Sequence, residues 1–147
     1  ELIDAGVNAQ ETLAMLSPPM PFCARVARLK ASRITKLFKI NEWIIALSNV
    51  SAYEASAARA LIELGAHVAA VAGTKNGKIE ISLRSSLEFY KQTSIHLGRD
   101  IAKPLGEHLN GMGGGHATAA GVNGEGDIEI GLKWCFSLLK ERLDSHN

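Results

Sequence analysis

Three consecutive glycines followed by a histidine, Gly113, Gly114, Gly115 and His116, are the residues of this chain best suited to bind an anion. Glycine has no side chain and readily adopts positive φ, so the N–H groups of such a segment can converge on one oxygen-rich ligand. The imidazole of His116 can add an N–H donor at the edge of the pocket. A flexible linker is the alternative, but the small, apolar residues 117–121 are typical of a chain packed behind a functional loop. The sequence therefore predicts a backbone-lined pocket for a phosphate-bearing ligand.

Arg84 is the second candidate for binding an anion. It follows Ser82 at the end of a predicted strand, where the chain enters a serine-containing loop. A guanidinium is suited to bidentate contacts with phosphate oxygens. A single arginine at a strand end is nevertheless more often part of a surface ion pair, and the residues alone favour that interpretation.

The histidines, cysteines and carboxylates show no spacing typical of a metal site or a catalytic centre. The sequence contains no HExxH, no phosphate-binding P-loop, no GxSxG and no recognisable carboxylate pair. His67, His96, His108 and His146 share no spacing with carboxylates or cysteines. Nothing in the chain activates water, so the sequence predicts a binding module without a cofactor of its own.

The elements that must position these residues alternate between helix and strand. Helices are predicted over 8–16, from Pro21 onward, and over 51–64, 94–105 and 127–143, with strands over 35–40, 43–50, 67–73, 78–84 and 117–122. Asn41-Glu42 and Asn76-Gly77 have the composition of hairpin turns. The pattern predicts an α/β fold with a mixed central sheet of about five strands and helices packed on both faces.

Local signals predict where two of the helices begin and which side of one is buried. In the helix after Pro21, Phe22, Val26 and Leu29 form an apolar stripe expected to face the core. Its basic side is expected to face solvent, with a phosphate-facing surface as the second interpretation. Asn8 and Ser51 are in N-cap positions, each with a glutamate three residues later.

Composition limits the class of protein. The chain has 147 residues, 46% hydrophobic and 21% charged, as expected for one soluble globular domain. The net charge of +1 means that any contact with nucleic acid must be local. Its apolar runs are far shorter than the roughly 20 residues that span a bilayer.

Cys23 and Cys135 are expected to be reduced core thiols of a cytoplasmic protein, a disulfide between them being the alternative. The start at Glu1 is expected of a domain cut from a longer chain.

Several motifs, taken in order along the chain, resemble the DHH-associated C-terminal domain. They are Ser-Ala-Tyr-Glu-Ala-Ser-Ala-Ala-Arg at 51–59, Leu-Gly-Ala at 64–66, Ser-Leu-Arg-Ser at 82–85, the glycine–histidine segment at 113–116 and Ala-Ala-Gly at 119–121. This domain is the substrate-binding partner of DHH phosphoesterases, which include RecJ-like exonucleases, nano-RNases and cyclic-dinucleotide hydrolases. The resemblance covers roughly residues 35–143.

The resemblance implies a division of labour. Residues 1–34 would be a helical linker from a missing catalytic DHH domain, and 35–147 the substrate-binding domain. The catalytic domain of this family carries an Asp-His-His motif and two divalent cations, usually Mn²⁺ with Mg²⁺ as the alternative. This sequence lacks that motif. Arg84 matches the arginine that clamps a phosphate, Ser82 lies beside it, and 113–116 match the loop that closes around the substrate end. The resemblance therefore favours Arg84 as a phosphate ligand over the ion pair.

The expected function is phosphate and nucleic-acid binding within a metal-dependent phosphodiesterase. Its partners would be a short single-stranded oligonucleotide or phosphorylated nucleotide and the DHH domain of the same protein, with no membrane; a homodimer is left open. The full-length protein is expected to be a hydrolase, while the chain itself lacks the catalytic metals. The alternative is a non-catalytic nucleic-acid-binding module resembling the C-terminal domain of alanyl-tRNA synthetase. A third interpretation, a domain that mainly dimerises, leaves the glycine segment unexplained.

Overall fold

Helices and strands alternate along the chain in a computed structural model that describes residues 20–145. The helices are α2 (Phe22–Ile34), α3 (Glu54–Leu64), α4 (Leu87–Thr93), the π-helix η1 (Leu97–Ala102), α5 (Lys103–His108) and α6 (Ile128–Asp144). The strands are β1 (Lys36–Ile40), β2 (Trp43–Asn49), β3 (Val68–Lys75), β4 (Lys78–Ser85), β5 (Met112–Gly115) and β6 (Ala119–Gly124). The predicted α/β class is confirmed, with six strands rather than about five.

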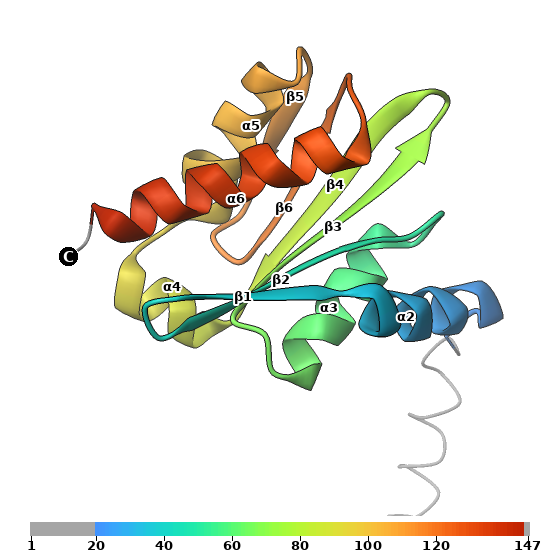
Figure 1. Cartoon of the computed structure of the whole chain (residues 1–147), viewed down its shortest axis with the longest axis horizontal. Coiled ribbons are helices and arrows are strands. Elements are labelled where there is room, and N and C mark those ends of the chain that lie inside the picture. Colours follow the sequence, from blue (N-terminus) through green and yellow to red (C-terminus); the bar gives the residue numbers. More distant parts are fainter. Residues whose placement is uncertain (1–19, 146–147) are drawn as a thin grey trace, which may run out of the picture.

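One mixed sheet organises the molecule (Figure 1). Its strand order is β1-β2-β3-β4-β6-β5, in which only β2 and β3 are parallel. Helices α2 and α3 lie on one face and α6 on the other, so the expectation of helices on both faces is confirmed. The larger core is on the α6 side, where Ile79, Ile81 and Leu83 of β4 are fully buried with Cys135 and Leu139 of α6.

The predicted turns form as their residue types require. Asn76 and Gly77 both have positive φ, 54° and 77°, as a two-residue hairpin turn of the favoured kind demands. Gly65 ends α3 with φ 129°, and its N–H donates to carbonyl oxygens of the last turn. These signals are local, and the structure confirms them.

Helix α3 begins two residues later than the Ser51 cap predicts. It starts at Glu54 after Tyr53, which has φ 61°, and no side chain caps it. The reason lies in the sheet: the Val50 N–H still donates to Ala72 O at 2.9 Å, so the chain is held to β3 when it reaches Ser51. The Glu54 carboxylate lies against Gly73 of β3 rather than reaching back to a cap.

The buried side of α2 is also different from the prediction. Phe22 and Leu29 are 77% and 72% exposed, while Ala24, Ala27 and Ala31 are buried. Alanines let the helix lie close against α3 and the sheet, where the Ser48 hydroxyl donates to Ala31 O at 3.0 Å. Phe22 and Leu29 therefore face outward while Val26 is half-buried, because the close packing of the alanines outweighs the burial of larger side chains.

The segment between β4 and β5 differs from the single helix expected over 94–105. Helix α4, which the sequence interpretation missed, precedes it, and Ser94 ends α4 with φ 59°. The π-helix η1 and then α5 follow from Leu97. The predicted helix over 8–16 and its Asn8 cap lie outside the described residues, as do most of the 1–34 linker and His146.

The cysteines are both thiols, but only one is in the core. Cys135 is buried, and burial raises the pKa of its thiol to about 12. Cys23 is exposed on the outward side of α2, which corrects the expectation of two core thiols. Across residues 20–145, no helix is long and apolar enough to cross a membrane.

Candidate anion-binding site

Part of one sheet face carries no helix. Helix α3 lies over β3 and the adjoining side of β4, which leaves β6 and β5 open on that face. Along β4, alternate residues point to opposite faces, so Glu80, Ser82 and Arg84 are half-buried on the α3 side. We call this surface the open strip; it consists of Glu80, Ser82, Arg84, Met112, Gly114, Ala119, Gly121 and Asn123.

Strand register brings two of the predicted site residues, Ser82 and Gly114, together on this strip through Gly121. Ser82 pairs with Gly121, and Gly121 pairs with Gly114, so the three form one row across β4, β6 and β5. They line a shallow cavity of about 460 Å³. The side-chain-free positions Gly114 and Gly121 form its floor, and no atom would meet a Cβ at Gly114 within 4 Å. A ligand can therefore approach the backbone here.

The glycine segment is an edge strand rather than the expected loop. Of its three glycines only Gly115 has positive φ, 143°, so the N–H groups do not converge as a nest. Gly113 and Gly115 face away from the open strip, toward η1 and α5. A Cβ at Gly113 would collide with the Ala102 carbonyl, and one at Gly115 would lie 2.6 Å from Ala119 O. These two glycines allow close packing, and Gly114 alone lies on the strip.

His116 begins the tight turn between β5 and β6. Its N–H donates to Ala119 O at 2.7 Å, and its carbonyl accepts from Gly98 N–H of η1 at 3.0 Å. The backbone is thus fixed while the imidazole stays exposed. Ala119 pairs with Arg84, so the turn lies at the same end of the strip as that guanidinium.

Arg84 has an unsatisfied donor. Its Nε is buried and has no hydrogen-bond partner among residues 20–145, and no carboxylate there forms an ion pair with it. Burial and then the nearby charge of Arg59 lower the pKa of the Arg84 guanidinium. The surface ion pair that the residues alone favoured is therefore absent from the described part of the chain. Arg59 was not singled out, because only the packing of α3 on β4 brings it near Arg84.

Asp100 anchors the helix that holds the His116 turn. Its carboxylate accepts from the His96 N–H at 2.8 Å and from Arg99 Nε at 3.0 Å, with Arg142 of α6 4.0 Å away. The hydrogen bond from Arg99 is the main reason that the pKa of Asp100 lies below its usual range. Asp100 thus ties α6 to the start of η1, whose first N–H groups bind the turn.

Replacing Asp100 with asparagine should lower stability by about 1–3 kcal/mol at neutral pH. Because the folded-state pKa is depressed, the carboxylate's contribution is complete above its unfolded pKa and is lost as pH falls through the folded value. The stability gap between parent and variant should thus be constant above about pH 5 and close below about pH 4. Urea unfolding across this range measures it. A gap that persists unchanged to about pH 2 would contradict the assignment.

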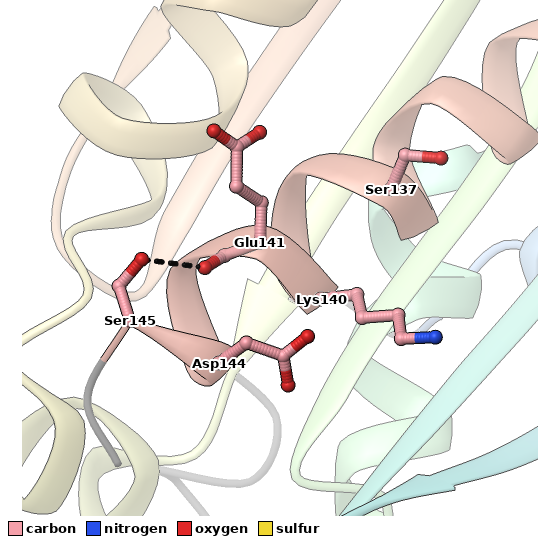
Figure 2. A pocket seen from close by; sticks show the side chains of 5 residues that line it. All are labelled: Ser137, Lys140, Glu141, Asp144 and Ser145. Carbon is pink, nitrogen blue, oxygen red and sulfur yellow. Dashed lines mark hydrogen bonds between the residues drawn. The ribbon is translucent and has the colours of Figure 1, made fainter.

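A second hollow lies along the C-terminal end of α6, away from the open strip. Figure 2 shows its five lining residues, all from this one segment, with the Ser145 hydroxyl donating to Glu141 O at 2.8 Å. Separate elements do not converge there, and none of the predicted site residues takes part. The open strip is therefore the better candidate.

Residues that could hold a metal ion are not grouped in the described chain. Within 20–145 no cluster of three His, Cys, Asp or Glu side chains has a suitable arrangement. The open strip offers the carboxylate of Glu80, the hydroxyl of Ser82 and the side-chain amide of Asn123, together with the guanidinium of Arg84. This chemistry suits an anion with further polar groups.

Comparison with known proteins gives a family match and several likenesses. A family model described as the DHHA1 domain matches residues 47–133. An uncharacterized protein of Methanocaldococcus jannaschii is 33% identical over 117 residues, covering 80% of this chain and 35% of that protein. The chain thus spans about a third of that relative's length.

Two solved structures share the fold. An exopolyphosphatase-related protein from Bacteroides fragilis matches with a TM-score of 0.64 and 17% identity, over 98% of this chain and 42% of that one. The C-Ala domain of alanyl-tRNA synthetase from Aquifex aeolicus matches with a TM-score of 0.56 and 23% identity, over 74% of this chain and 97% of that domain. At these identities the likeness concerns the fold alone.

Proposed function

The chain belongs to the DHHA1 domain family, and from that premise we propose that it binds the phosphate of a short oligonucleotide or nucleotide for a DHH-type phosphodiesterase. The family resemblance drawn from the motifs is confirmed. The proposal goes further: the full-length protein is a RecJ-like exonuclease or nano-RNase of the cytoplasm, and this chain is its substrate-binding part.

The observation that carries the proposal is the buried, unpartnered Nε of Arg84. A buried donor without a partner costs about 1–3 kcal/mol, and an anion that accepts its hydrogen bond removes that cost. The neighbouring charge of Arg59 also favours an anion, since it disfavours a second isolated cation. Ser82 and the Gly114 backbone lie on the same face, and His116 begins the turn beside Arg84. These groups are the proposed phosphate ligands.

Hydrolysis is assigned to the DHH domain, outside this sequence. The described residues do not fit the two-metal centre of the family, because they contain no group that could hold even one ion. In the proposal, Mn²⁺ or Mg²⁺ belongs to the catalytic domain. The role of this chain is to hold the substrate in place, which lowers the entropic part of the barrier without supplying a nucleophile.

Titrating the 147-residue chain with a 5′-phosphorylated dinucleotide tests the proposal. We expect weak, saturable binding by calorimetry and no cleavage of the dinucleotide after prolonged incubation with Mn²⁺. A preparation that includes the upstream region should cleave the same substrate. Metal-dependent cleavage by the 147-residue chain, or a complete lack of binding, would overturn this division.

A non-catalytic nucleic-acid-binding module is the second candidate. The likeness to the C-Ala domain favours it, since that domain is matched over 97% of its length. The two proposals differ in ligand size. A module of the second kind should bind a folded RNA far more tightly than a dinucleotide, whereas a substrate-binding domain that grips one terminal phosphate should not.

A further inference from the structure

The shallow cavity includes two of the proposed phosphate ligands, Ser82 and Gly114, and reaches from them toward Glu80. Glu80 and Arg84 lie on the same face of β4, four residues apart, which corresponds to about 13 Å along the strand. Ser82 stands midway, and the cavity covers the Glu80 end. The proposed phosphate site thus continues into a hollow with a different chemistry at its far end.

A hydrogen-bond acceptor and a donor stand side by side at that far end. Glu80 pairs with Asn123 across β4 and β6, so their side chains share the open strip. The Asn123 Oδ1 accepts from the Met112 N–H at 3.3 Å, which leaves the amide NH₂ to donate. The Glu80 carboxylate forms no hydrogen bond or ion pair with other residues in 20–145. The Glu80 carboxylate can only accept hydrogen bonds, whereas the NH₂ group of Asn123 can donate them.

The floor between the two ends is flat. Gly114 and Gly121 expose their backbone, and the nearest atom to a Cβ at Gly121 would be 3.8 Å away. Met112, 76% exposed, lines one side of the hollow. A planar ring can lie on such a floor without displacing side chains, and a thioether contacts aromatic rings favourably.

We propose that this end of the cavity binds the base of the nucleotide whose phosphate lies at Arg84, with a preference for guanine. The Glu80 carboxylate would accept from the N1–H and N2–H₂ groups of guanine while the Asn123 amide donates to O6. Adenine and cytosine offer a carboxylate only one amino group, and uracil offers one N–H between two carbonyls. The inference rests on the proposed phosphate site and adds a specificity to it.

Calorimetric titration of the 147-residue chain with mononucleotides tests the preference. We expect GMP to bind about tenfold more tightly than AMP or CMP, because it alone makes two charge-assisted hydrogen bonds to Glu80. IMP lacks only the N2 amino group and should bind about tenfold more weakly than GMP. Ribose 5-phosphate reports on the phosphate site without a base.

Two variants test whether the Glu80 carboxylate causes the preference for GMP. Glu80→Gln should abolish the advantage of GMP over IMP and leave the affinity for ribose 5-phosphate unchanged. Glu42→Gln, in the exposed turn between β1 and β2, makes the same chemical change outside the cavity and should leave every affinity unchanged. The comparison of GMP with IMP uses the parent chain alone. It therefore tests the preference for guanine even if Glu80→Gln does not fold.

The outcomes separate this inference from the proposed function. Equal affinity for the four nucleotides, with Arg84-dependent binding of ribose 5-phosphate, overturns the base preference and leaves the phosphate site standing. Absence of binding by ribose 5-phosphate and by every nucleotide overturns both. A GMP preference that persists in Glu80→Gln overturns the role assigned to that carboxylate.

Discussion

Arg84→Ala should weaken binding of a 5′-phosphorylated dinucleotide by about tenfold to a hundredfold, the loss expected for a charge-assisted contact with phosphate. The stability of the variant should equal or slightly exceed that of the parent. The substitution removes a buried donor that has no partner and a cation close to Arg59. Calorimetry and urea unfolding of the same preparation measure both quantities.

Arg25→Ala is the matched control for Arg84→Ala. Arg25 is exposed on α2, so its removal makes the same change in net charge away from the open strip. Binding by this variant should stay within about twofold of the parent, since exposed charges are largely screened by salt. An Arg84→Ala variant that binds as the parent does, or that loses several kcal/mol of stability, would contradict the role given to Arg84.

Gly113→Ala should destabilise the fold by about 2–4 kcal/mol, as overpacking against backbone does. The new Cβ would collide with the carbonyl of Ala102, and neither strand nor helix can yield cheaply. Gly114→Ala is the neighbouring control. A Cβ there meets nothing within 4 Å, so folding stability should change by less than about 0.5 kcal/mol.

The two alanine variants should also differ in binding. Gly114→Ala places a methyl group on the cavity floor, so it should fold normally and bind the dinucleotide more weakly. Urea unfolding and calorimetry separate the effects. Equal destabilisation by the two substitutions would mean that the alternation of faces along β5 has been assigned incorrectly.

Most of the elements that were predicted correctly rest on local signals. The alternation along 78–84 and the Asn76-Gly77 turn each require nothing beyond neighbouring residues, and β4 formed as expected. The start of α3 and the buried side of α2 depend instead on which distant surfaces come into contact. Alanines occupy the buried side of α2 because this helix lies close to α3. Amphipathic spacing does not reveal how closely two helices approach each other.

The candidate site divides in the same way. Ser82 and Arg84 lie on the same face because side chains alternate along one strand. The same alternation places Glu80 on that face, but the sequence analysis did not single it out. Arg59 lies on another element, and no spacing in the sequence connects it to Arg84. Glycine has a low preference for strands, so 113–115 are typical of a loop until pairing with β6 is known.

The glycine composition of β5 has a consequence for the register of the sheet edge. A strand made almost entirely of glycine has few side chains to fix its alignment, and such strands are prone to slip against their neighbours. Here η1 and α5 hold the alignment, because Gly98 and Gly106 fit against Gly115 and Gly113 at backbone contact. Loosening η1 would free β5 to slide by one residue, which would turn Gly114 away from the cavity. The amides of β5 should therefore exchange with deuterium sooner than those of β3 and β4, through local opening rather than global unfolding.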